Sequence, residues 1–278
     1  MQTRSSRRSS TPFLSSGAVS RPRIPYVVLA IFILTAGVTA NLGAATISVP
    51  GFSFESQVVA PPFPVDTRID SWQKAPKPAY FDEGAFGFTW DQTMGVFPNT
   101  PVGTGNHIDN MNGNQAAYML AFPQASLFQD YNSLDWAHAA PSHDFNAMFE
   151  VGKSYQLTLG LLGGGGISVG SIFQLSLYYR DAADNRVTIG ALPITYTSGV
   201  FSNATHLLDF TLNLAEVQAT DAWAGKNIGI ELSSIYGTGA GYWDLDNVRL
   251  TSAVPEPGSL SLAVLGLTGL AIRRRLKR

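Results

Sequence analysis

Tyr155 to Leu162 reads YQLTLGLL, a stretch in which every second residue from Tyr155 to Leu161 is large and apolar. The same alternation returns in IFQLSLYYR, from Ile172 to Arg180, and in YWDLDNVRLT, from Tyr242 to Thr251. Residues two apart lie on one face of a β-strand, so this period predicts strands with one buried and one solvated face.

The rest of the C-terminal half repeats the pattern in Val187 to Thr197, His206 to Leu214 and Asn227 to Ser234, with turn residues between the runs. Leu214 to Trp223 is the one segment that suits a short helix. Strands that follow one another without intervening helices disfavour a doubly wound or barrel enzyme fold. We therefore expect an all-β fold, an antiparallel β-sandwich of jelly-roll type.

The N-terminal half gives weaker signals. Phe52 to Ser56 (FSFES) and Ala116 to Phe122 (AAYMLAF) are predicted strands, whereas Pro61 to Gly113 between them reads mostly as loop. Because so long a loop is unusual in a compact domain, we expect this segment to hold undetected strands or a functional surface.

The body of the chain is acidic. Ten of the 18 Lys and Arg residues lie in the first 23 and the last six residues, and all but one of the 20 Asp and Glu residues lie between positions 46 and 252. That region therefore has 19 acidic against 8 basic residues, which argues against nucleic-acid binding. The chain has no cysteine, which excludes thiolate chemistry and cysteine metal sites.

Residues 1–45 have the order of a secretory signal peptide with a long basic start. Five arginines precede the apolar run IPYVVLAIFILTAGVTA (residues 24–40), and small residues follow through Ala45. Cleavage after Ala40 and cleavage after Ala45 both fit this pattern, and a retained membrane anchor is the alternative. We expect the ectodomain to occupy residues 46–252.

Residues 253–278 contain three parts in a fixed order. Val254, Pro255, Glu256 and Pro257 come first, followed by an apolar run to Ile272 and the basic tail RRRLKR. As a helix the apolar run spans about 22 Å, and snorkelling arginines extend it towards the ~30 Å hydrocarbon core of a membrane. The basic tail favours a cytoplasmic C-terminus, so we expect the preceding domain to lie outside the cytoplasm.

This order resembles the PEP-CTERM sorting signal. The resemblance implies recognition by a membrane protease-transpeptidase of the exosortase type that cuts near Pro255, Glu256 and Pro257. It also implies a Gram-negative host that makes an exopolysaccharide, inner-membrane anchoring during sorting, and a final place at the cell-envelope surface or in the extracellular matrix. A plain tail anchor with a chance Pro-Glu-Pro is the alternative.

Short pieces of the body resemble galactose-binding-like jelly rolls, which are common in secreted carbohydrate-binding modules. In such jelly rolls a structural calcium ion often joins the first and last strands, and the resemblance places its carboxylate ligands at Glu55 and Asp246. Two carboxylates plus backbone carbonyls are a usual oxygen supply for calcium. The alternative is that both are ordinary strand-edge residues. The pieces are FSFES (52–56), NGNQAAYM (112–119), SLFQDY (126–131), FEVGKSYQLTLGL (149–161) and YWDLDNVRLT (242–251).

Aromatic residues between Pro61 and Gly113 are candidates for stacking on sugar rings. Trp72 and Trp90 lie among polar residues, so we expect these two to be the carbohydrate-binding residues. Trp243 lies on an alternating strand and is expected in the core.

Motifs that point to catalysis are weak. Gly166 to Gly170 matches the G-x-S-x-G pattern, but it follows a glycine run and precedes a strand rather than a helix. His138 and His143 have a spacing that fits no familiar zinc site. Asp82 and Glu83 would cleave a glycoside only as a pair across a cleft. We therefore expect no catalytic residues.

Together these features predict a non-enzymatic, exported surface or matrix protein that binds polysaccharide. The alternative is a secreted polysaccharide-active hydrolase or lyase with its site in residues 61–143. Short aromatic loops and the lack of an acid–base pair favour the first.

If the C-terminal signal is processed, the mature protein lacks the residues after about Pro257. The intact mass of protein purified from its native host should show this loss. Protein at the cell surface that still carries Arg278 would contradict the prediction.

Overall fold

The computed structural model describes residues 44–60, 64–134 and 145–254, and most of their regular structure is β-strand. Residues 1–43 of the predicted signal peptide and the predicted C-terminal membrane helix lie outside these residues, whereas Ala45 begins β1. Helical elements within them are α2 (Glu83–Phe86) and the 3-10 helix η1 (Trp90–Thr93). The strands are β1 (Ala45–Ile47), β2 (Gln73–Lys74), β3 (Met94–Pro98), β4 (Gln115–Leu120), β5 (Ala125–Gln129), β6 (Ser154–Gly164), β7 (Ile172–Arg180), β8 (Arg186–Thr195), β9 (Leu208–Leu214), β10 (Gly229–Tyr236) and β11 (Tyr242–Ala253).

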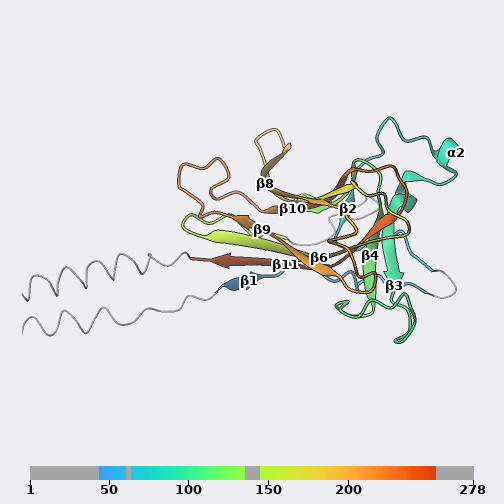
Figure 1. Cartoon of the computed structure of the whole chain (residues 1–278). Helices are drawn as coiled ribbons and strands as arrows, with labels where there is room; N and C mark the ends of the chain where they lie inside the picture. Colours follow the sequence, from blue (N-terminus) through green and yellow to red (C-terminus); the bar gives the residue numbers. More distant parts are fainter. Residues whose placement is uncertain (1–43, 61–63, 135–144, 255–278) are drawn as a thin grey trace, which may run out of the picture. The chain divides into compact units, whose positions relative to one another are not determined.

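The strands form two antiparallel sheets. Sheet A has the order β3-β4-β11-β6-β9, with β1 also paired to β11, and sheet B has the order β2-β5-β10-β7-β8. Figure 1 shows the sheets as two stacked layers. The predicted all-β antiparallel sandwich is confirmed, and the Pro61 to Gly113 segment does hold undetected elements, β2, α2, η1 and β3.

β11 lies at the centre of sheet A. One edge pairs with β6 from Tyr242 to Ala253, while the other edge pairs first with β4 and then with β1. The register breaks after Asp246, where Asn247 adopts a left-handed φ of 56°. We call the end of the domain where β1 begins and β11 ends the terminal pole, and the opposite end, which carries α2, the distal pole (Figure 1).

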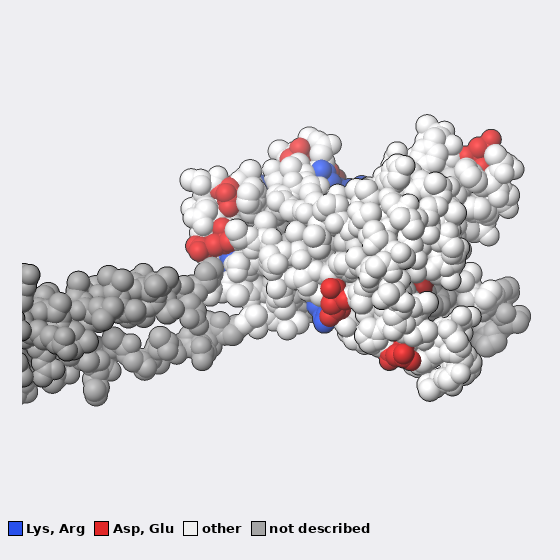
Figure 2. Space-filling view, viewed as in Figure 1, with Lys and Arg blue, Asp and Glu red and all other residues white. Residues whose placement is uncertain are grey.

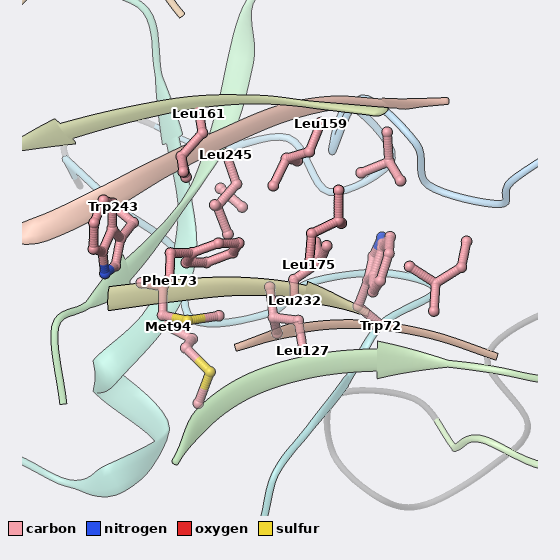
Figure 3. Packing of buried hydrophobic residues seen from close by; sticks show 14 of the residues in the cluster. Trp72, Met94, Leu127, Leu159, Leu161, Phe173, Leu175, Leu232, Trp243 and Leu245 are labelled. Atoms are coloured by element: carbon pink, nitrogen blue, oxygen red, sulfur yellow. The ribbon is translucent and has the colours of Figure 1, made fainter. Parts of the chain in front are cut away.

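The core fills the space between the two sheets. Leu161 and Leu245 project from sheet A and face Leu175 and Leu232 of sheet B, and all four side chains are fully buried (Figure 3). Trp243 is fully buried beside Phe173, with ring centroids 5.6 Å apart, which confirms its predicted core position. The period-two alternation of β6, β7 and β11 thus puts one row of each strand into a common core.

Two local predictions were wrong. Phe52 to Ser56 is a turn rather than a strand, because Phe54 has a φ of 56° and its N–H donates to the carbonyl of Gly51. Leu214 to Trp223 is not a helix, because the backbone of buried Val217 bonds instead to the 152–153 turn.

Replacing Leu245 by Ala should lower the free energy of unfolding by about 2–5 kcal/mol, because it leaves a cavity between the sheets. Val102→Ala is the control, since that side chain is 85 % exposed and its loss should change the free energy by about 0.5 kcal/mol or less. Urea unfolding of both variants checks this. Equal midpoints for the two would contradict the core position of Leu245.

Candidate functional site

Loops from both sheets contact one another at the distal pole. The N–H of Gly239 donates to the carbonyl of Ala121 at 2.9 Å, and the hydroxyls of Ser168 and Thr238 lie 3.1 Å apart. These contacts join segments that are far apart in the sequence into one surface. The segments are 75–93, 121–124, 165–171 and 235–241.

An aromatic cluster centred on Phe81 underlies this surface. The ring of Phe86 stacks on Phe81 with centroids 4.8 Å apart and planes 21° apart. Trp90 and Phe122 meet Phe81 edge-on, with centroids 4.9 and 5.2 Å away. Each such ring pair contributes roughly 0.5–1.5 kcal/mol beyond the area it buries, so the cluster holds its members in fixed orientations.

The single turn of α2 places Phe86 beside Phe81. Asp82 caps the turn by accepting hydrogen bonds from the N–H groups of Gly84 and Ala85, at 2.9 and 3.3 Å. Gly87 ends the turn with a left-handed φ of 79°, which glycine adopts without strain.

Four aromatic rings of the described residues reach solvent at the distal pole, of which Tyr242, at the start of β11, is the least exposed at 37 %. Tyr80 is 47 % exposed and donates its hydroxyl to the carbonyl of Pro123, Phe86 is 43 % exposed, and Tyr236 at the end of β10 is 60 % exposed. We call Tyr80, Phe86 and Tyr236 the distal aromatic surface. At this pole Figure 2 shows carboxylates where α2 lies, among atoms of mostly uncharged residues.

The prediction that Trp72 and Trp90 stack on sugars is wrong. Trp72 is fully buried and Trp90 is 5 % exposed. Their indole N–H groups donate to backbone carbonyls, that of Trp72 to Gly51 at 3.1 Å and that of Trp90 to Ala75 at 2.8 Å. Each ring therefore satisfies its polar atom inside the domain, and neither face is free for a ligand.

The structure brings Glu55 and Asp246 to the same short segment. Oε1 of Glu55 accepts hydrogen bonds from the N–H groups of Asn114 and Gln115, at 2.8 and 2.7 Å. Asp246 accepts from the N–H groups of Asn112 and Asn247. The two carboxylates thus hold the C-terminal end of the 99–114 loop against the register break in β11.

The environment of Asp246 disfavours a negative charge on its carboxyl group. Its side chain is fully buried, and this burial, together with the nearby charge of Glu55, raises the pKa of Asp246 to about 7. No group of three or more His, Cys, Asp or Glu side chains within the described ranges is arranged to hold a metal. A calcium ion here would therefore need carbonyl or water oxygens beside the two carboxylates. The calcium ion between Glu55 and Asp246 stays a prediction.

Asp244 is a buried carboxyl that sequence reasoning missed. It is 5 % exposed, its Oδ1 has no hydrogen-bond partner in the part of the chain that the structure describes, and burial raises its pKa to about 8. It lies on the outer face of sheet A, in register with Tyr118 and Leu162. In the alternating sequence YWDLD, Asp244 occupies a polar position. This pattern predicts an exposed side chain, so nothing in the sequence indicates that Asp244 is buried.

The carboxylates considered for catalysis have structural partners. Asp82 caps α2, and Oε1 of Glu83 accepts the N–H of Trp90 at 2.9 Å. Ser168 lies in a turn between β6 and β7, so the G-x-S-x-G match has no strand-to-helix geometry. His138 and His143 lie outside the described residues.

With this geometry in view, residues 253–275 match the family model of the PEP-CTERM protein-sorting motif. The chain carries a PEP-CTERM sorting signal. The signal marks an exported protein that is anchored in a membrane during sorting. Among curated proteins, none matches the chain.

Solved structures share the fold. A cyclase from Fischerella sp. in its apo form has a TM-score of 0.53 at 18 % identity, over 77 % of this chain and 98 % of that one. A Stig cyclase from Fischerella sp. TAU, in complex with an indole compound, has a TM-score of 0.52 at 19 % identity, over 77 % and 100 %. A carbohydrate-binding module of the CBM4 type has a TM-score of 0.38 at 13 % identity, over 74 % and 99 %. At these identities the likeness to the two cyclases concerns the fold alone.

The PEP-CTERM motif begins where the sandwich ends. Ala253 is the last residue of β11, and Val254 after it is 43 % exposed. The remaining predicted motif residues, Pro255, Glu256 and Pro257, lie outside the described residues. Among those described, no helix has the length and apolar character to cross a membrane.

If Glu55 and Asp246 share a calcium ion, calcium at 100 times its dissociation constant should stabilise the fold by about 2.7 kcal/mol. The gain in melting temperature should be larger at pH 8 than at pH 5.5, because the pKa of Asp246 is near 7 and protons compete for the ligand. Differential scanning calorimetry with calcium and with chelator measures both.

Asp246→Asn should abolish the calcium response, while Asp209→Asn, an exposed control on β9, should keep it. A calcium response that persists in Asp246→Asn would show that the ion binds at a different place in the protein. Identical melting temperatures with calcium and chelator would remove the site.

Proposed function

We propose that this protein is a non-enzymatic component of the cell surface or extracellular matrix, sorted through its PEP-CTERM signal, that binds neutral polysaccharide at its distal aromatic surface. An exosortase-type membrane protease would break one peptide bond near Pro255–Pro257 and pass the acyl group to water or to an amine acceptor. The sandwich would then remain outside the inner membrane.

The observation that carries the binding proposal is the placement of exposed rings at the pole opposite the sorting signal. Tyr80, Phe86 and Tyr236 are between 43 and 60 % exposed, while the PEP-CTERM motif begins at the end of β11. A domain held at the terminal pole would present the distal aromatic surface outward. Sugar rings have apolar C–H faces that an exposed aromatic ring covers.

Charge favours a neutral ligand. Positions 46–252 hold 19 acidic against 8 basic residues, so acidic polymers meet repulsion. That repulsion is screened beyond a Debye length of about 10 Å at 0.1 M salt, whereas stacking is not. Binding of a neutral polymer should therefore change little with salt.

Calcium would act as a structural cofactor in this proposal. Glu55 and Asp246 hold the loop that returns to β4, so an ion between them would fix that loop against β11. The ion would supply positive charge beside two carboxylates and would not take part in a reaction.

For the hydrolase or lyase alternative, the part of residues 61–143 that the structure describes offers no supporting pair of carboxyl groups. A glycosidase needs two carboxyl groups facing each other across the scissile bond. In residues 61–143, Asp82 and Glu83 bond to backbone amides, and Asp91 pairs with buried Lys74. We therefore propose no catalytic residue for this chain.

Tyr80→Ala and Phe86→Ala should each weaken binding of a neutral glucan or galactan about thirtyfold, since a hot-spot aromatic typically contributes 2 kcal/mol or more. Val102→Ala, exposed on a different loop, should bind as wild type does. Isothermal titration calorimetry checks this, beside a melting curve for each variant, because Phe86 also packs on Phe81. Wild-type affinity in both aromatic variants would end the proposal.

A further inference from the structure

The last strand of the sandwich runs directly into the sorting motif. β11 extends through Ala253, the first residue of the PEP-CTERM match, and Pro255 is two residues further on. The backbone carbonyl of Ala253 accepts a hydrogen bond from the Ser154 hydroxyl at 3.2 Å, and Ser252 is 5 % exposed. The residues just before the motif are therefore held in the sheet.

A protease requires its substrate in an extended, accessible form on both sides of the bond that it cuts. The backbone of residues 250–252 lies between β1 and β6, and Ala253 pairs with β6, so the hydrogen-bonding groups of this segment are engaged in the sheet. An enzyme embedded in the membrane would meet the folded domain two residues from the motif. Cutting after folding thus requires local opening of the end of β11.

The two strands that pair with the C-terminal end of β11 hold it through pairings of different length. β6 has eleven residues and pairs with β11 along its whole length. β1 has three residues, pairs only with Leu250 to Ser252, and leaves Ala45 and Thr46 exposed. Short edge strands with exposed side chains open at low free-energy cost, so β1 is the side from which the end of β11 is released.

We infer that the pairing of β1 with β11 is a gate on C-terminal processing, which rests on the proposed sorting by a membrane protease. While β1 is paired, the end of β11 is held and the motif is cut slowly. When β1 separates, residues 252–254 become available to the enzyme. The N-terminal cut sets this gate, because cleavage after Ala45 removes one of the three residues of β1 and cleavage after Ala40 leaves all three.

Pulse-chase labelling of the full chain in its native host tests the gate. Ile47→Pro fixes φ and removes an amide N–H opposite Leu250, so it should speed C-terminal processing about tenfold, which corresponds to about 1.4 kcal/mol. N-terminal sequencing of the product confirms that the signal peptide is cut at the same bond as in wild type.

Two further variants separate local opening from global unfolding. Ile194→Ala deletes buried atoms from β8 at the distal pole and should leave the processing rate as in wild type. A Gly-Ser-Gly-Ser spacer between Val254 and Pro255 should speed processing and make it insensitive to Ile47→Pro. Equal acceleration by Ile194→Ala, or a wild-type rate for either Ile47→Pro or the spacer variant, would overturn the gate.

A different variant tests the sorting proposal separately from the gate. The double variant Pro255→Ala, Glu256→Ala should abolish processing. If it is processed normally, the motif is not what the enzyme reads, and the sorting proposal itself fails. If it is not processed while Ile47→Pro behaves as wild type, sorting stands and only the gate is lost.

Discussion

The backbone pairing of β11 is the interaction on which the rest of the domain depends. Its length along β6 fixes the register of sheet A, and its other edge is divided between β4 and β1. The division creates a break at Asp246, where backbone amides would lack strand partners. The carboxylates of Glu55 and Asp246 supply acceptors there, so the break becomes the anchor of the 99–114 loop.

The buried indole of Trp90 supports the exposed ring of Phe86 at the distal pole through Phe81. Trp90 bonds to the carbonyl of Ala75 and supports Phe81, and Phe81 in turn supports Phe86. A ring held in this way loses little conformational freedom when a ligand covers it, which lowers the cost of binding. Trp90 thus supports the distal aromatic surface although it is itself only 5 % exposed.

The sequence predicted the sandwich because period-two alternation reports directly on one buried face, as in Tyr155 to Leu162. It failed at Phe54, whose left-handed backbone follows from tertiary packing rather than from propensity. It also failed at Trp72, because a polar neighbourhood in sequence does not show that a distant carbonyl satisfies the indole. The sorting motif needed no fold to be predicted, since its parts are contiguous in the chain.

The position of β11 also determines how the domain resists mechanical pulling. A load between a ligand at the distal pole and an attachment after Ala253 runs along the axis of β11. Its hydrogen bonds to β6 are then strained together in shear rather than opened one at a time. Shear shares the force over the whole strand, and the rate of forced unfolding, not equilibrium stability, sets how long such a link survives. The central strand would thus suit the surface or matrix role proposed above.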